Sequence, residues 1–186
     1  MCSSDLGSGK STLLNILGTL ESYDSGSIES FGYSDPYKNV SKAMMIRREN
    51  IAYLFQNFAL VDNMTVKENI DIALKYSEFK NNKKEINKTL DKLGIADKLN
   101  NKVYELSGGE QQRVSMARIL LKPYDVLLAD EPTGSLDEFN KRILMQVLIE
   151  ENRKGKSIVV VSHDKDFTSI CDKTYEIIDK KLEVIK

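Results

Sequence analysis

The sequence predicts an α/β fold in which a mostly parallel sheet is flanked by helices. Three short apolar runs, at residues 51–55, 126–129 and 157–161, have the length and composition of buried strands. Segments with helical periodicity separate these runs, and strands that alternate with helices indicate a parallel sheet. A long helical stretch between the first two runs predicts a helical subdomain within about residues 62–122.

The length and composition fit one ordinary globular domain covering residues 1–186. Lys+Arg is 27 and Asp+Glu is 28, and this net charge of −1 argues against a nucleic-acid partner that is held by bulk charge. No run approaches the roughly 20 apolar residues of a membrane span, and no secretion signal opens the chain. We therefore expect a cytoplasmic protein that does not bind nucleic acid.

Periodicity and breaker residues predict the N-terminal elements. A dense apolar face predicts a helix over residues 11–20, and Gly18 and the polar run after it end this helix. Alternation of polar and apolar residues predicts a strand over 27–31, and Pro36 marks the following residues, 32–39, as a loop.

The remaining elements follow from the same signals. Apolar residues at three-to-four spacing predict helices within 66–121, and the last of them runs from about residue 109 to Leu121. An amphipathic pattern predicts a helix from residue 138 to about residue 152. Two further apolar runs predict closing strands at 175–178 and 182–185.

A phosphate-binding loop precedes the first predicted helix. Glycines allow backbone N–H groups to approach phosphate oxygens, and the helix N-terminus adds its dipole. Lys10 would hold the β- and γ-phosphates, and the Ser11 hydroxyl would bind Mg²⁺. The alternative for this string alone is a surface glycine turn before a helix. The candidate nucleotide-binding residues are Gly7, Ser8, Gly9, Lys10, Ser11 and Thr12.

The beginning of the chain departs from the usual pattern of such loops. The full pattern has glycine where Ser4 stands, and the residues before Gly7 form no apolar strand. We therefore expect that the N-terminal strands of the domain are missing. Because the loop would then lack its anchoring strand, we also expect weak or absent nucleotide hydrolysis by residues 1–186 alone.

Two acidic residues end the apolar run at 126–129. Asp130 is placed to hold Mg²⁺, and Glu131 is placed to act as the base that polarises the attacking water. The alternative is an ordinary strand followed by a polar turn, because Pro132 and Gly134 are turn residues. The phosphate-binding loop upstream favours the first interpretation.

The most specific string is Leu-Ser-Gly-Gly-Glu-Gln-Gln-Arg at residues 106–113. A serine and two glycines that open a long helix make a second anion site at a helix N-terminus. With this string the sequence resembles the ABC ATPase family, of which it is the signature motif. The resemblance implies a P-loop NTPase of ABC type and ATP hydrolysis with Mg²⁺ as cofactor.

The resemblance also assigns roles to residues that the other motifs leave open. Gln56 matches the Q-loop glutamine that senses Mg²⁺ and the γ-phosphate, and His163 matches the switch histidine at the γ-phosphate. Asp137 matches the D-loop aspartate. The implied catalytic residues are Glu131, His163 and Gln56, and the implied metal ligands are Ser11, Gln56 and Asp130. The residues implied to contact ATP bound to a second subunit are Ser107, Gly108, Gly109, Glu110 and Gln111.

In this family ATP is held between two ATPase subunits, so the resemblance implies a homodimer. It also implies a separate transmembrane permease that docks around residues 57–64 and the helical region after them. The chain would then lie on the inner face of the cell membrane. Strings at 13–18, 55–58 and 128–134 are similar to the macrolide-export and lipoprotein-release class.

Residues 53–68 are most similar to the lactococcin-type bacteriocin exporters of that class, which implies export of a peptide, a bacteriocin or a similar substrate. Two alternatives stay open. The ATPase could act on a permease-like partner that moves no substrate, as a regulatory or mechanotransmission module, or the chain could be an inactive fragment.

Overall fold

The computed structural model describes residues 9–134 and 136–185. Its strands are β1 (Glu29–Ser30), β2 (Tyr33–Ser34), β3 (Ile51–Leu54), β4 (Val126–Asp130), β5 (Ser157–Val161), β6 (Tyr175–Ile178) and β7 (Lys181–Val184). The α-helices are α1 (Lys10–Leu17), α2 (Val40–Glu49), α3 (Val66–Leu74), α4 (Lys83–Leu93), α5 (Gly108–Leu120), α6 (Glu138–Arg153) and α7 (Lys165–Ile170). Short 3₁₀ turns are η1 (Pro36–Lys38), η2 (Glu78–Asn81), η3 (Ala96–Lys98) and η4 (Val103–Glu105).

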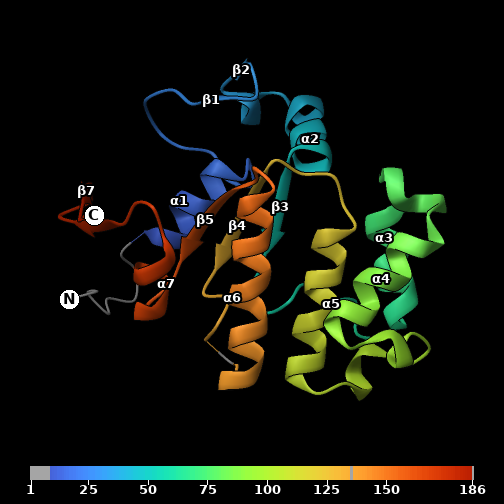
Figure 1. Ribbon diagram of the computed structural model, residues 1–186. Helices are drawn as coiled ribbons and strands as arrows, with labels where there is room; N and C mark the ends of the chain where they lie inside the picture. The colour runs from blue at the N-terminus through green and yellow to red at the C-terminus, as the bar shows by residue number, and fades with distance from the viewer. Residues whose placement is uncertain (1–8, 135, 186) are drawn as a thin grey trace.

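A parallel sheet with the order β3-β4-β5 lies at the centre of the fold (Figure 1). Leu54 pairs with Ala129, and Ala129 pairs with Val160, so the carboxyl ends of the three strands lie at one edge. Alternate residues of β4 enter two different apolar clusters, with Leu128 in one and Leu127 in the other. This pattern is typical of a parallel sheet that is covered on both faces.

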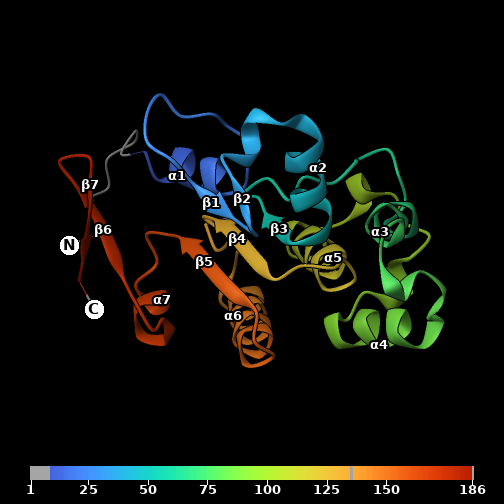
Figure 2. The same cartoon turned by 90° about the horizontal axis from the view of Figure 1, so that it is seen from above.

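Helices cover the two faces of this sheet, as Figure 2 shows. On one face Leu14 of α1 and Ile46 of α2 pack against Ile51 and Leu128, and all four side chains are buried. The larger cluster on the other face contains buried side chains of α3, α5 and α6. The sheet and these helices therefore form the α/β core that the sequence predicts.

Three α-helices lie between residues 66 and 120, beyond the β3 edge of the sheet (Figure 2). A capping box between Thr65 and Glu68 starts α3, because the Thr65 hydroxyl accepts from the Glu68 N–H and the Glu68 carboxylate accepts from the Thr65 N–H. Leu90 and Leu93 of α4 are buried in the same cluster as α5. This helical region is thus continuous with the main core.

Two expectations for residues 11–39 need correction. The first helix ends at Leu17, because Thr19 has a left-handed φ of 57° and the chain turns away there. The strand expected at 27–31 shrinks to β1, which pairs with the unpredicted strand β2. Phe31 and Gly32 join them with φ values of 52° and 78°, which is typical of a tight hairpin turn.

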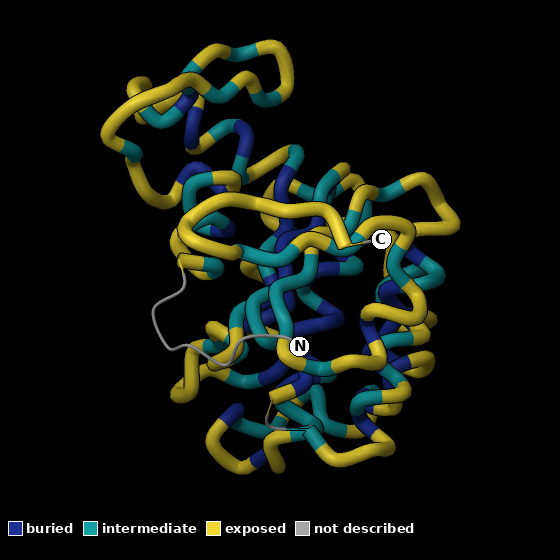
Figure 3. The backbone as a smooth tube through the Cα atoms, turned by 90° about the vertical axis from the view of Figure 1, so that its left-hand side faces the viewer, coloured by how far each residue is buried: buried dark blue, intermediate teal, exposed yellow. Residues whose placement is uncertain are grey.

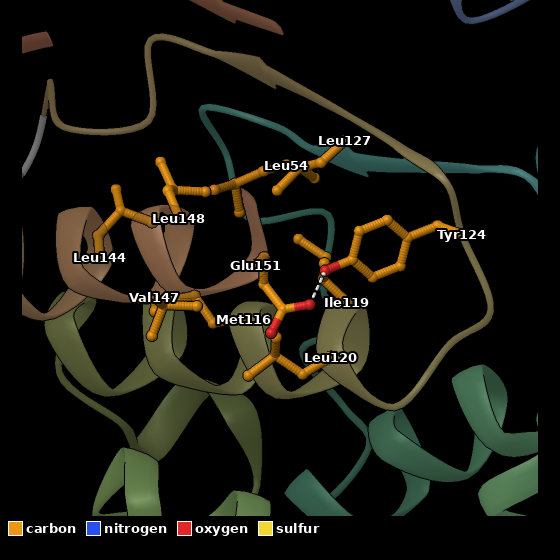
Figure 4. Close-up of a pocket in the computed structure, with 10 residues that line it drawn as sticks. All are labelled: Leu54, Met116, Ile119, Leu120, Tyr124, Leu127, Leu144, Val147, Leu148 and Glu151. Carbon is orange, nitrogen blue, oxygen red and sulfur yellow. Dashed lines mark hydrogen bonds between the residues drawn. The ribbon is translucent and has the colours of Figure 1, made fainter. Parts of the chain in front are cut away.

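A buried polar pair ties α6 to the segment that enters β4 (Figure 4). The Tyr124 hydroxyl donates to Glu151 Oε2 at 2.6 Å beside a cavity of about 10 Å³ lined mainly by leucine, isoleucine and valine side chains. A space of that size holds a single water molecule at most. Burial, and then the neighbouring carboxylate, raise the pKa of Tyr124 well above its usual range, so the hydroxyl stays protonated and the pair is structural.

The C-terminal hairpin of β6 and β7 packs less closely than the central sheet. It is antiparallel, and its exposed apolar side chains include Tyr175, Leu182 and Val184. Figure 3 shows this hairpin as a mostly exposed stretch of chain that ends near the C-terminus. Among the described residues, no helix has the length and apolar character required to cross a membrane.

Candidate functional site

The N-terminus of α1 begins at the phosphate-binding loop. Gly9 is the residue before the helix and adopts a left-handed φ of 86°, which a residue with a side chain rarely adopts. Lys10 is the first residue of α1. Among the described residues, no side chain caps the N-terminus of this helix. Gly7 and Ser8 lie outside the described residues. The helix start therefore presents backbone N–H groups next to Lys10, Ser11 and Thr12.

The carboxyl end of β4 lies beside this helix start. The Ser11 hydroxyl donates to Asp130 Oδ1 at 3.1 Å, although 118 residues separate the two in the chain. A hydroxyl and a carboxylate oxygen at this distance suit Mg²⁺, which prefers hard oxygen ligands. The residues present therefore fit the metal, and Ser11 and Asp130 are the two expected ligands that the structure brings into contact.

Glu131 has an unusual backbone conformation that aims its carboxylate at β5. Its φ is 43°, in the left-handed region, and its N–H donates to the Val161 carbonyl at 2.8 Å. The carboxylate Oε2 accepts from the His163 N–H at 3.3 Å, and Oε1 lies 3.3 Å from His163 Nε2. The structure thus brings the expected base and the expected switch histidine together at the ends of neighbouring strands.

Gln56 lies just after β3, at the same edge of the sheet. Its side chain is exposed, and a Cβ added to Gly134 would lie 4.0 Å from Gln56 Nε2. Tyr53 lies within β3, three residues before Gln56. Its burial and, second, the Asp130 carboxylate raise the pKa of Tyr53 to about 12. Its hydroxyl therefore stays protonated and donates to Asn15 Oδ1 at 2.7 Å, which ties β3 to α1.

The signature motif forms the N-terminus of α5. Ser107 caps the helix because its hydroxyl oxygen accepts from the Glu110 N–H at 3.3 Å, and the Ser107 N–H and hydroxyl in turn donate to Glu110 Oε2 at 2.9 and 2.8 Å. The bonds from the Ser107 N–H and hydroxyl, in that order, lower the pKa of Glu110 despite some desolvation. Gln111 donates to the carbonyls of Val103 and Leu106 at 3.2 and 3.1 Å. In this chain Glu110 and Gln111 therefore hold the motif together.

Asp137 is the N-cap of α6, and its carboxylate accepts from the Asn140 N–H at 2.8 Å. Ser135, which the sequence grouped with it, lies outside the described residues. Figure 1 shows α5 and α6 running side by side with their N-termini at the same end. In Figure 2, α1 lies over the β4 and β5 part of the parallel sheet and α5 lies beside β3, and the two helices pack into different apolar clusters. The signature motif therefore does not join the group formed by Ser11, Asp130 and Glu131.

Sequence reasoning missed several polar residues that link these motifs. Asn140 and Lys141, in the first turn of α6, contact α5 and α7 respectively. Gln112 of α5 is buried and donates to the Pro132 carbonyl at 3.3 Å. The only signal in the sequence was the Asp-x-x-Asn spacing of a helix cap, which says nothing about partners far away in the chain.

The comparisons with known proteins agree with this geometry. Residues 5–134 match the family described as ABC transporter. The macrolide export ATP-binding/permease protein MacB of Psychrobacter cryohalolentis is 38% identical over 177 residues, which is 93% of this chain and 26% of the relative. The lipoprotein-releasing system ATP-binding protein LolD of Aquifex aeolicus is 40% identical over 178 residues, 95% of this chain and 80% of the relative.

Solved structures give the same result. The dimeric structure of MJ0796, a bacterial ABC transporter cassette, has a TM-score of 0.85 at 31% identity and covers 98% of this chain and 83% of that one. A post-hydrolysis state of MJ0796 bound to ADP and Pi has the same TM-score and identity. The chain spans about a quarter of the length of the MacB relatives. It belongs to the ABC transporter family, carries the ATPase domain of that family, and is related to the macrolide-export and lipoprotein-release proteins.

Proposed function

We propose that this protein binds ATP with Mg²⁺ at the carboxyl edge of its parallel sheet, hydrolyses it, and drives a membrane-embedded partner. The observation that carries this proposal is the convergence of two pairs, Ser11 with Asp130 and Glu131 with His163, at the end of β4 and beside the start of α1. Acidic oxygens, a histidine and helix N–H groups within one site are the parts that phosphoryl transfer requires.

Each residue has a distinct role in the proposed reaction. The N–H groups at the start of α1, together with Lys10, bind the phosphates of ATP and orient them. Ser11, Asp130 and Gln56 hold the metal, which neutralises negative charge on the phosphate oxygens when it is bound. Glu131 takes a proton from the attacking water, and His163 contacts the γ-phosphate. Glu131 Oε1 is buried and, although it lies 3.3 Å from His163 Nε2, accepts no hydrogen bond from the described residues, which suits a base.

We propose further that the ATP-binding site is complete only when two copies of this domain come together. The helix α5, which begins with the signature motif, packs into a different apolar cluster from α1 and lies apart from it in Figures 1 and 2, so in this proposal the motif does not contact the nucleotide bound by its own chain. Ser107, Gly108 and Gly109 would instead contact the ATP of the second copy, with Glu110 and Gln111 supporting them. The dimeric form of MJ0796 supports this arrangement.

A membrane-embedded permease is the proposed partner. The printed name of MacB joins an ATP-binding part to a permease, and LolD is an ATP-binding protein of a lipoprotein-releasing system. Exposed apolar side chains around the loop after Gln56, which include Val61, Met64 and Tyr104, offer a surface for such a partner. The chain would then lie at the inner face of the membrane. The proposed cargo is a peptide, a bacteriocin or a similar substrate, and a neighbouring gene for a bacteriocin precursor would support it.

ATP-driven dimerisation in the Glu131→Gln background tests the central proposal, because slow hydrolysis allows the closed dimer to accumulate. We expect light scattering to report a dimer with ATP and a monomer without it. Adding Ser107→Arg should abolish the dimer and leave ATP affinity unchanged, because residue 107 contacts only the nucleotide of the partner. Ser41→Arg, on the exposed side of α2, adds the same charge and should have no effect. A chain that stays monomeric with ATP in all three variants would contradict the proposal.

A further inference from the structure

The first turn of α6 contacts two elements that carry different nucleotide-binding motifs. Asn140 faces α5, whose N-terminus is the signature motif, and Lys141 faces the start of α7, which follows His163. Asn140 therefore contacts the helix that begins with the proposed contact to the partner's ATP. Lys141, the next residue, contacts the segment that follows the proposed contact to the chain's own ATP.

The contact on the α5 side is close and nearly buried. Asn140 is 9% exposed, and its Nδ2 donates to both carboxylate oxygens of Asp137 at 2.9 and 3.0 Å. Arg113 Nη1 donates to Asn140 Oδ1. Gly109 packs so tightly here that an added Cβ would lie 2.7 Å from Asn140 Cγ. Because no side chain at position 109 fits this space, the second residue of α5 is held directly against the cap of α6.

The contact on the α7 side is an ion pair with two carboxylates. Lys141 Nζ lies 2.7 Å from Asp164 and 2.5 Å from Asp166, and the Lys141 side chain is 14% exposed. The hydrogen bonds that Lys141 donates, first to Asp164 and then to Asp166, raise the pKa of Lys141 well above its usual range. Partial burial opposes ionisation of Asp164, but the bonds from Lys141 and the Asp166 N–H lower its pKa overall. Both charges of the pair therefore persist at neutral pH.

The two contacts share one rigid element. Asn140 and Lys141 lie within the first turn of α6, whose backbone Asp137 caps. A displacement of the segment carrying His163 would therefore be transmitted through Asp164 and Lys141 to this turn, and through Asn140 to Gly109. Gln112, which donates to the Pro132 carbonyl, is a second link between α5 and the turn after β4.

We propose that the first turn of α6 couples the chain's own ATP site to its signature motif, with Asn140 and Lys141 as positioning residues. The proposal rests on the function proposed above. ATP that contacts His163 orders the segment at residues 163–166, and Lys141 and Asn140 relay this order to Ser107, Gly108 and Gly109. The chain's own nucleotide thus prepares the surface that receives the nucleotide of the second copy.

Hydrogen exchange tests this coupling within a single copy, at concentrations where light scattering shows a monomer. The ligand is the β,γ-imido analogue of ATP with Mg²⁺, and its binding is measured separately by calorimetry. In the unaltered chain we expect the analogue to slow exchange at residues 105–113 by at least roughly threefold. Asn140→Leu and Lys141→Met should each remove this response and leave the affinity for the analogue within about twofold.

Two exposed positions of α6 provide matched controls. Gln146→Leu removes an amide and Arg142→Met removes a positive charge, so both should retain the response at 105–113. A response that persists in Asn140→Leu and Lys141→Met would overturn the coupling, and so would its loss in the two controls as well, since that would report general loosening. An analogue that does not bind to the unaltered chain would instead overturn the proposed function itself.

Discussion

The N-termini of α1 and α5 begin with similar residues but are built differently. Gly9 precedes α1 with a left-handed backbone, and no described side chain caps that helix. Ser107 precedes α5 and forms a reciprocal capping box with Glu110. The start of α1 lies beside Asp130, whereas the start of α5 is held by its own Glu110 carboxylate, which bonds Ser107 and pairs with Lys98, and by Gln111. The start of α1 therefore lies beside the groups proposed to react with ATP, whereas the start of α5 is fixed by contacts within its own motif.

In the proposed site between two copies, this difference would give the two helix N-termini of one chain different roles. Reactive groups gather where the strands of the sheet end, because parallel strands and their following loops meet at one edge. At the signature end, the Ser107 hydroxyl and the Glu110 carboxylate are already bonded to each other. The contribution of this end is therefore the position of its backbone N–H groups, which depends on the packing of α5 against α6.

The largest expected effect is at the α1 end. Glu131→Gln removes the proposed base and keeps the shape of the side chain, so we expect whatever phosphate release the unaltered chain shows to fall by at least about 100-fold. ATP affinity, measured with a fluorescent nucleotide, should stay within about twofold, because the α1 N–H groups and Lys10 are unchanged. Glu183→Gln, on the exposed β7 strand, serves as the control. Equal phosphate release from the two variants would exclude Glu131 as the base.

The second effect concerns packing at the α5 end. Gly109→Ala places a methyl group against Asn140, so we expect a loss of about 2 to 3 kcal/mol in the free energy of unfolding by urea. Gly108→Ala is the matched control, since no described atom lies within 4 Å of its added Cβ. Equal stability of the two variants would show that α5 does not depend on the close approach at Gly109.

The third effect concerns the other end of α5, where Lys122 anchors the helix. Its Nζ donates to the carbonyls of Arg47 and Ile51, and burial, together with the charge of Arg118, lowers its pKa to about 8. Between this value and the ordinary pKa of lysine, the unfolded chain binds more protons than the folded one. Stability therefore rises with pH in that interval.

Urea unfolding of the unaltered chain and of Lys122→Met at several pH values measures this contribution. From pH 7 to pH 9.5, we expect the free energy of unfolding of the unaltered chain to rise by about 2 kcal/mol relative to the variant. Parallel curves for the two proteins would show that Lys122 keeps an ordinary pKa and that its burial does not constrain α5.

Sequence patterns predicted the central elements well. Residues 157–161 were expected as a strand and are β5, and the strands and helices expected near β3, β4, α5 and α6 differ from the structure by two residues or fewer. The strand β2, which completes the short hairpin with β1, and the helix α2 were not predicted, because their residues carry weak periodicity. Val40 and Met44 of α2, for example, are exposed, whereas Ala43 and Ile46 alone make its buried face.

The sequence by itself determined the fold class, the family and the residues of each motif, because strand and helix periods and short motif strings are local properties of the chain. Tertiary structure alone decided which motifs meet. It joined Ser11 to Asp130 and Glu131 to His163, and it held Gly109 of α5 against Asn140 of α6. These contacts depend on the order of strands in the sheet and on helix packing, which no local pattern encodes.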